Sequence, residues 1–241
     1  MDVDVKDPAR DELTAPVGSA RVLDALLAQR FTCRGYRSEQ VPQGTIEAIL
    51  RTAQRTASWC NVQPWKLVIT RGEGTERFRR ALVEHNAGAP PHDSDMAFPG
   101  EYKGVYQQRR RVSGFQLYEA VGVARGDREA SARQAALNYS FFGAPHVAIV
   151  TTPRDLGVYG AVDCGGYVAN LMSAAHAHGV ATTPQGAIAR HSGFIRDYFQ
   201  IPDDRMVVCG VAFGFADHDH VANSYRTFRA DLDQVVEFAD A

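Results

Sequence analysis

The sequence predicts a protein in which helices are combined with a few short, buried strands. Three apolar runs, at 66–70, 146–151 and 206–213, are bounded by turn residues in the way that is typical of strands. Helical periodicity occupies most of the chain between them. With 241 residues, 45% of them hydrophobic, the chain can bury a sizeable core as one large domain or two small ones.

The formal net charge is −2, so bulk electrostatics favour neither nucleic acid nor an anionic membrane as a partner. No apolar run approaches the length that spans a bilayer, and the first seven residues are acidic where a signal peptide would be basic. We therefore expect a cytoplasmic protein that binds small molecules or a second copy of itself.

The four cysteines are widely spaced and form no Cys-x-x-Cys pair: Cys33, Cys60, Cys164 and Cys209. This spacing argues against a zinc knuckle or a disulfide scaffold and predicts reduced, buried thiols. Cys60 lies in a polar stretch, so a nucleophilic role for it also has to be considered.

The first helix is predicted to follow an N-terminal arm formed by residues 1–18, which is either disordered or draped over a neighbour. Ser19 is a plausible N-cap, and the apolar stripe after it ends near Gln29. A second helix opens at Val41-Pro42 and runs to about residue 57.

Arg30-x-Thr32-x-Arg34 follows the first helix. Two guanidinium groups and a hydroxyl in this spacing can make the charge-assisted contacts that hold a terminal phosphate. The competing interpretation is two solvated surface arginines, which the block alone does not exclude.

The stretch from Ser58 to Trp65 carries two amides, a hydroxyl and two indoles. Pro64 is expected to force Gln63 out of the α region and give the loop an extended exit, so that Asn61 and Gln63 offer donors and acceptors at fixed positions. The stretch is therefore either the floor of a ligand site or an ordinary connector in which Trp65 belongs to the core.

The segment 86–100 contains three prolines and predicts a long loop, followed by helices at about 101–123 and 127–142. A helix over Thr75–His85 is predicted to precede that loop, with Thr75 as its cap. Four aromatic residues of the 101–123 helix either belong to the core or roof a cavity for a flat ligand: Tyr102, Tyr106, Phe115 and Tyr118.

His146 begins the second predicted strand and is interpreted as a structural histidine. The apolar helix predicted over 159–178 should be buried on every side, in a core or in a subunit interface, with Gly165-Gly166 allowing a close approach. Gly179 is expected to end it. Residues 180–187 are predicted to form a loop that presents backbone N–H groups to a ligand, or only a turn.

Asp217-His218-Asp219-His220 resembles a metal-binding cluster, but nothing near it in the sequence completes a ligand set, so we predict no metal site. A helix is expected over 191–198. The sequence has neither a Gly-x-Gly-x-x-Gly after a strand nor a P-loop, which argues against a Rossmann or P-loop nucleotide site.

Four blocks in order resemble the FMN-dependent nitroreductase family: Arg30-x-Thr32-x-Arg34, Ser58-x-x-Asn61-x-Gln63-Pro64-Trp65, the stretch from Gly179 to Gly186, and Asn223-x-x-Arg226-x-x-Arg229. They extend from about residue 20 to 232. The chain is most similar to the branch that contains nitrobenzoate and benzothiazinone reductases. Phe31 stands where many members carry a second basic residue, and Thr32 where many carry serine.

The resemblance implies an α+β fold with a central mixed sheet flanked by helices, an intertwined homodimer, and a single domain over 19–241. One FMN would lie at each of two subunit-interface sites, with a helical insert at about 86–140 covering it. The implied phosphate ligands are Arg30, Thr32, Arg34 and Arg229, with Arg226 close by. Ser58, Asn61 and Gln63 would contact the flavin from the other subunit, and Pro184, Gln185 and Gly186 would face flavin N5 and O4.

The hypothesis that follows is an NAD(P)H oxidoreductase that reduces nitroaromatic or similar flat acceptors by a ping-pong mechanism. No side chain is predicted to be catalytic, because the flavin carries the chemistry. The alternatives are a same-fold flavoenzyme with another reaction (dehalogenation, azoline oxidation, flavin breakdown), a non-catalytic flavin-binding protein, and a Cys60 hydrolase or transferase.

Overall fold

The computed structural model describes residues 16–239. Most of the predicted arm, residues 1–15, lies outside them. The helices are α1 (Ser19–Gln29), α2 (Gln43–Ala53), α3 (Glu73–Ala87), α4 (Gly104–Ala120), α5 (Arg128–Ala136), α6 (Gly157–Ala177) and α7 (Ser192–Phe199). None of these described helices is both long and apolar enough to cross a membrane.

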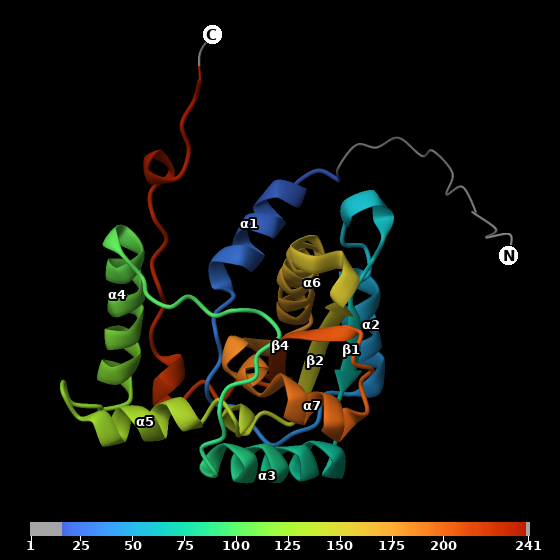
Figure 1. The fold of residues 1–241 in the computed structure, drawn as a ribbon. Helices are drawn as coiled ribbons and strands as arrows, with labels where there is room; N and C mark the ends of the chain where they lie inside the picture. Colours follow the sequence, from blue (N-terminus) through green and yellow to red (C-terminus); the bar gives the residue numbers. More distant parts are fainter. Residues whose placement is uncertain (1–15, 240–241) are drawn as a thin grey trace, which may run out of the picture.

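Four strands form the central sheet in the order β1-β2-β4-β3 (Figure 1). They are β1 (Lys66–Ile69), β2 (His146–Pro153), β3 (Ala181–Gln185) and β4 (Arg205–Gly214). All three strand pairs are antiparallel, so the predicted α+β class is confirmed. The mixed character that was predicted is confined, among the described residues, to one isolated parallel bridge between Thr32 and Thr182.

Strand β3 was predicted to be a loop, which is wrong. It contains Pro184, which cannot donate a backbone hydrogen bond, and this made the segment resemble a turn. Within the four-stranded sheet β3 pairs only with β4, opposite Val211 and its neighbours. A proline is tolerated in such an edge strand because its nitrogen need not donate to a second neighbour.

Helices cover both faces of the sheet (Figure 1). One core packs α2 and α6 against the sheet and includes Trp65, Tyr167 and Leu171. The other packs α3, α7 and the 3-10 segment Gly186–His191 against the opposite face and includes Phe78 and Phe141. Strand β2 is buried along nearly its whole length because both of its faces are covered.

Several predicted helix boundaries are wrong by a few residues. Gly18, not Ser19, is the N-cap of α1, and the Ser19 hydroxyl donates instead to Pro16 O at 2.6 Å. Gly72, not Thr75, is the N-cap of α3, and Thr75 donates to Pro145 O from inside the core. Helix α5 ends at Ala136 because the chain turns before Phe141 and Phe142, which have positive φ angles.

Helix α6 is not buried on every side. Cys164, Tyr167 and Leu171 lie in the core, whereas Val158 and Val162 of the opposite face are exposed. Its close approach to the sheet occurs at Gly160, where a Cβ would lie 2.5 Å from Thr152 Oγ1. Gly165 has no heavy atom of another element near it. Gly179 has a φ of 72° and ends the helix as predicted.

The aromatic residues of the segment 101–123 do not form core. Helix α4 has no buried residue, and Tyr102, Tyr106 and Phe115 are exposed. The helix stands apart from the sheet at the left of Figure 1, beside the C-terminal tail. Tyr118 is half-buried and lines a cavity described below.

His146 is a structural histidine, as predicted. It is buried, its Nε2 accepts a hydrogen bond from Val41 N–H at 3.0 Å, and its Nδ1 lies 3.1 Å from Thr70 O. The Nδ1–H tautomer satisfies both contacts.

His191 should make the stability of the protein depend on pH. Neither of its buried ring nitrogens has a hydrogen-bond partner in the described chain. Burial, followed by the charges of His85 and His92, lowers its pKa against an opposing contribution from Asp93. The unfolded chain, with a histidine pKa of about 6.5, then binds the proton more readily, so stability is lost as the pH falls below about 6.5.

We expect the Tm to drop between about pH 7.5 and about pH 5.5, and to drop less in His191→Phe, since the ring is replaced by one that cannot be protonated. Thermal unfolding at the two pH values measures this. His218→Phe, in an exposed turn, is the matched control and should keep the full drop. An unchanged pH dependence in His191→Phe would contradict the assignment.

Candidate functional site

A cavity of about 270 Å³ joins the two arginine blocks of the sequence, although they lie almost 200 residues apart. It lies where the end of α1, the segment after it, α4 and the C-terminal tail meet. Its lining residues are Leu27, Ala28, Arg30, Phe31, Thr32, Arg34, Ser113, Tyr225, Arg226, Thr227 and Arg229. The four residues predicted to hold a phosphate, and Arg226 beside them, therefore line one cavity.

The cavity has a strong excess of positive charge. Within residues 16–239, none of its four arginines makes an ion pair with a carboxylate. Burial, followed by the nearby charge of Arg229, lowers the pKa of Arg30. Two guanidinium groups that repel one another in a partly buried cavity would be stabilised by an anion of high charge density.

Arg34 is fixed by the C-terminal block. Its backbone N–H donates to Asn223 Oδ1 at 2.8 Å, and its Nη1 donates to Tyr225 Oη at 3.1 Å. Asn223 is itself buried and donates to Gly35 O at 2.8 Å and to Asp217 O at 2.7 Å. The first and last blocks are thus joined by hydrogen bonds around the cavity.

Phe31 stands where a basic residue would have added another positive charge to the cavity, and it packs against Arg226 instead. The Arg226 guanidinium lies 4.0 Å from the centroid of the Phe31 ring, and its Nη1 donates to Asn223 O and Tyr225 O. Arg226 therefore stabilises the cavity wall, whereas Arg229 bonds, within residues 16–239, only to Thr227 and Phe228 of its own segment.

A second cavity, of about 200 Å³, shares Arg34 with the first and lies at the β3 edge of the sheet. It is lined by Arg34, Leu117, Tyr118, Gln134, Ala135, Asn138, Phe142, Thr183 and Pro184. Thr183 donates to Cys33 O and lies 2.7 Å from Tyr36 Oη, so the wall behind this cavity is rigid.

Gln185 follows Pro184 and ends the strand. The Gln185 side chain is buried, and its Nε2 donates to Asn138 O at 2.7 Å, while its Oε1 has no partner in the described chain. A buried amide oxygen without a partner costs free energy, on the order of 1–3 kcal/mol. Gly186 opens the 3-10 segment Gly186–His191.

Ser58, Asn61 and Gln63 line none of these cavities. They bond mainly to each other: Gln63 N–H donates to Ser58 Oγ at 2.9 Å, and Gln63 Nε2 donates to Asn61 Oδ1 at 3.1 Å. Trp65 is buried against Tyr167, as the connector interpretation predicts. The expected extended exit is wrong, since Gln63 has a φ of 51°.

This loop nevertheless stores backbone strain. Cys60, Asn61 and Gln63 all have positive φ angles, of 48°, 57° and 51°. Left-handed conformations of residues other than glycine are costly and cluster at functional sites. The loop is anchored by Trp59 N–H, which donates to Asp163 of α6, and the exposed Trp59 ring lies 5.0 Å from that of Tyr159.

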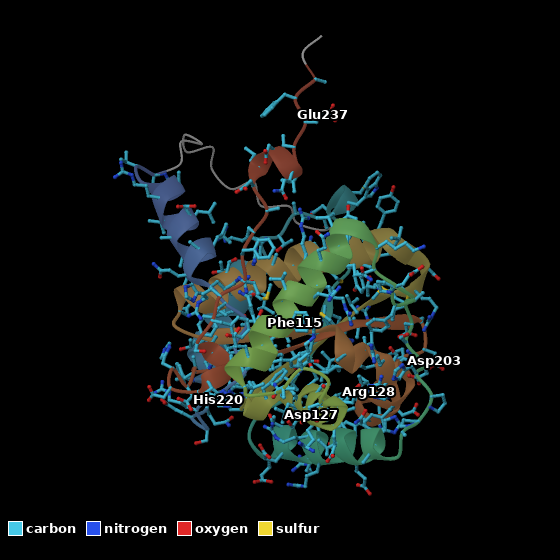
Figure 2. The ribbon with its side chains drawn as sticks, turned by 90° about the vertical axis from the view of Figure 1, so that its left-hand side faces the viewer. Phe115, Asp127, Arg128, Asp203, His220 and Glu237 are labelled. Carbon is cyan, nitrogen blue, oxygen red and sulfur yellow. The ribbon has the colours of Figure 1, made fainter. Side chains whose placement is uncertain are left out.

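Helix α4 and the C-terminal tail frame a third, larger cavity of about 480 Å³. Figure 2 looks onto α4, with Phe115 on it, Asp127 and Arg128 where α5 begins, and Glu237 near the end of the tail. Gln116 Nε2 donates to Arg226 O at 3.3 Å, and Arg109 donates to Gln234 at 3.3 Å. These contacts tie the helix to the tail and leave its other side exposed.

Residues 217–220 show no sign of a ligand set. Among the described residues no group of three or more His, Cys, Asp or Glu side chains could hold a metal ion. His220 instead accepts a hydrogen bond from Ala222 N–H. Cys33 and Cys164 are buried free thiols as predicted, whereas Cys60 is exposed.

Asn138, Tyr225 and Ser113 are among the lining residues that were not predicted. Asn138 holds Gln185, and its sequence context gives no signal for that role. Tyr225 could have been inferred, because it lies inside the block from Asn223 to Arg229.

Residues 27–215 match the model of the Nitroreductase family. The chain belongs to the nitroreductase family. Nitroreductase NfnB of Mycolicibacterium smegmatis is 31% identical over 233 residues, which cover 94% of this chain and 98% of that protein. The 4-nitrobenzoate reductase of a Nocardioides species is 31% identical over 241 residues, covering 97% of this chain and 95% of that one.

The fold of this nitroreductase-family protein is shared with a solved relative. A structure described as the FMN-dependent nitroreductase NfnB from Mycobacterium smegmatis in complex with NADPH superposes with a TM-score of 0.87 at 31% identity. The match covers 92% of this chain and 99% of that one. The predicted family and the nitroreductase-like fold are therefore confirmed.

Replacing Cys60 with glycine should stabilise this family member by up to about 1 kcal/mol. Glycine removes the cost of the left-handed conformation in the folded state, which is roughly 1–2 kcal/mol. This gain exceeds the cost of ordering the more flexible glycine on folding, which is about 0.5–1 kcal/mol. The free energy of unfolding from denaturant titrations, at matched ligand content, measures the change. Ala57→Gly, exposed in the same loop at negative φ, is the control and should destabilise. Equal losses in both variants would contradict the strain argument.

Proposed function

We propose that this chain is an FMN-dependent NAD(P)H oxidoreductase that reduces nitroaromatic or similarly flat acceptors in a ping-pong cycle. The observation that carries the proposal is the cavity of four arginines without carboxylate partners in the described chain, joined through Arg34 to a second cavity at the end of β3. The named relatives support it: one is a 4-nitrobenzoate reductase, and another is described as FMN-dependent and in complex with NADPH.

The residues present fit FMN. Arg30, Thr32, Arg34 and Arg229 would hold the phosphate, because three guanidinium groups without carboxylate partners in the described chain and one hydroxyl line the same cavity. The cavity beside Arg34 offers space next to Thr183 and Pro184 for the remainder of the molecule. The Gln185 amide oxygen, buried without a partner in the described chain, adds an acceptor close to that space.

Bound FMN would supply the redox chemistry, namely hydride acceptance from NADPH or NADH and electron transfer to the acceptor. The chain's own residues bind and orient it. The arginines would hold its phosphate, and the Pro184–Gly186 segment would present backbone groups to the ring. The hydrogen-bonded wall of Thr183 and Tyr36 fixes one side of the cavity. We assign no proton transfer to a side chain.

We propose that the functional unit is a homodimer in which a second copy contributes Ser58, Asn61 and Gln63. These residues lie outside the cavities of their own chain, in a strained loop beside an exposed apolar patch formed by Trp59, Val158, Tyr159 and Val162. Exposed apolar patches of this kind mark interaction surfaces. The segment at about 86–140 would cover the site, and residues 19–241 would act as one domain.

The decisive experiment follows the flavin itself. The purified protein should carry the visible absorbance of FMN, lose it on anaerobic mixing with NADPH, and regain it with a nitroaromatic acceptor. A flavin that NADPH does not bleach would favour a non-catalytic binding protein. Bleaching without turnover of nitroaromatics would favour one of the other reactions of the fold.

Arg30→Ala combined with Arg34→Ala should weaken FMN binding by several kcal/mol, because each charge-assisted contact to a phosphate is worth about 1.5–3 kcal/mol. Fluorescence titration of the apoprotein with FMN measures the dissociation constant. The double variant Arg51→Ala with Arg55→Ala, on and just after the exposed side of α2, removes the same charge and should bind normally. Full flavin content in the first variant would show the phosphate assignment to be wrong.

Val162→Glu should separate the two copies, because it places a charge in the exposed apolar patch of α6. Sedimentation velocity is expected to show a monomer, with a parallel loss of bound FMN. Val83→Glu, on the partly exposed face of α3, is the matched control and should remain a dimer. A dimeric Val162→Glu with full flavin would place the interface elsewhere.

A further inference from the structure

The loop between α3 and α4 is anchored by a buried carboxylate, that of Asp95, whose side chain is only 4% exposed. Its Oδ1 accepts from Arg154 at 2.9 Å, and its Oδ2 accepts from Arg196 at 2.5 Å and from Val207 N–H at 2.8 Å. Burial opposes ionisation, but the Val207 N–H and the two guanidinium groups hold the pKa of Asp95 below its usual value. The loop is thereby joined to three elements at once.

A second anchor lies two residues earlier. Asp93 N–H donates to Arg190 O at 3.0 Å, and Gly193 N–H donates to Asp93 Oδ2 at 2.9 Å. A Cβ at Gly193 would lie 2.3 Å from that carboxylate oxygen, so only glycine allows the contact. The loop is therefore fixed against the chain that continues directly from Gly186.

Phe98 follows these anchors and reaches Gly186. Its Cε1 lies 3.8 Å from the position that a Cβ of Gly186 would occupy, and the Arg190 guanidinium lies 5.2 Å from its ring centroid. The ring is 41% exposed. An aromatic surface is thus held next to the Pro184–Gly186 segment with part of it free to contact a ligand.

We propose that Phe98 is a specificity-determining residue that contacts the flat acceptor, and that Asp95 is the residue that positions it. The inference rests on the proposed function, because it requires the acceptor to bind beside Gly186. An aromatic ring at this position would favour flat acceptors by offset or edge contacts and would contribute little to a compact, non-aromatic oxidant.

Phe98→Ala should raise KM for nitrobenzoate roughly 3- to 10-fold, which is the range expected for one lost aromatic contact. Phe98→Tyr keeps the ring and should stay near the wild-type value. Flavin content, the rate of anaerobic reduction by NADPH, and turnover with ferricyanide should be unchanged in both variants. An unchanged KM for nitrobenzoate in Phe98→Ala, or an equal loss with ferricyanide, would overturn the proposal.

Asp95→Asn should reproduce the KM effect of Phe98→Ala, because it keeps the shape of the side chain but removes the charge that holds Arg154 and Arg196. If Asp95 acts through Phe98, the double variant is no worse than Phe98→Ala alone, whereas a merely structural role gives additive losses. Additive losses would overturn the positioning role. Arg154→Met, which removes the more exposed of the two arginine partners, serves the same test if Asp95→Asn does not fold.

Glu76→Gln is the matched control for the charge change. It removes the carboxylate that pairs with Arg79 on α3, away from the loop, and should leave every kinetic constant unchanged. The wild-type protein distinguishes failure of the proposed function from failure of this inference. If NADPH does not reduce its flavin, the proposed function is wrong. If the wild type turns over normally and Phe98→Ala has an unchanged KM for nitrobenzoate, only this inference is wrong.

Discussion

The pairing of β2 with β4 is the constraint on which the rest of the structure depends. Both strands are buried for most of their length, and their register places Val147 opposite Ala212 and Ile149 opposite Gly210. A Cβ at Gly210 would lie 2.5 Å from Ile188, so the segment after β3 can lie directly on β4. Strand β3 pairs in turn with β4, and its register places Gln185 opposite Gly210. A shift of that register would move Gly210 away from Ile188 and displace Gly186 with it.

The second organising feature is electrostatic. Folding brings Arg30, Arg34, Arg226 and Arg229 around one cavity without an acidic partner in the described chain, which costs free energy in the absence of a ligand. Hydrogen bonds to Asn223 and Tyr225 and the contact with Phe31 maintain the arrangement. A phosphate would relieve the repulsion, so binding and stability are thermodynamically linked at this cavity.

The sequence predicted what depends on local chemistry. The arginine blocks and the buried role of His146 follow from residue type and spacing, and the structure gathers the arginines at one cavity and buries His146. The apolar stripe of α1, by contrast, is exposed in this chain. The sequence did not predict β3, because Pro184 looks like a loop residue until its edge position is known. Asp95 and Phe98 were also missed, since their contacts join residues about 60 to 110 positions apart and leave no periodic signal.

The loop from Ser58 to Trp65 is the part of the predicted site that lines none of the cavities of its own chain. Its three left-handed residues cost free energy, yet its amides bond to each other and line none of the cavities described above. Strain of this kind persists only where the surrounding structure imposes it, and here Asp163 of α6 holds the loop beside an exposed apolar patch. The loop is thus preorganised, and a second copy that covers the patch would bring it to the ligand without further ordering. The contribution of this loop to the binding site would then be formed before the two chains associate.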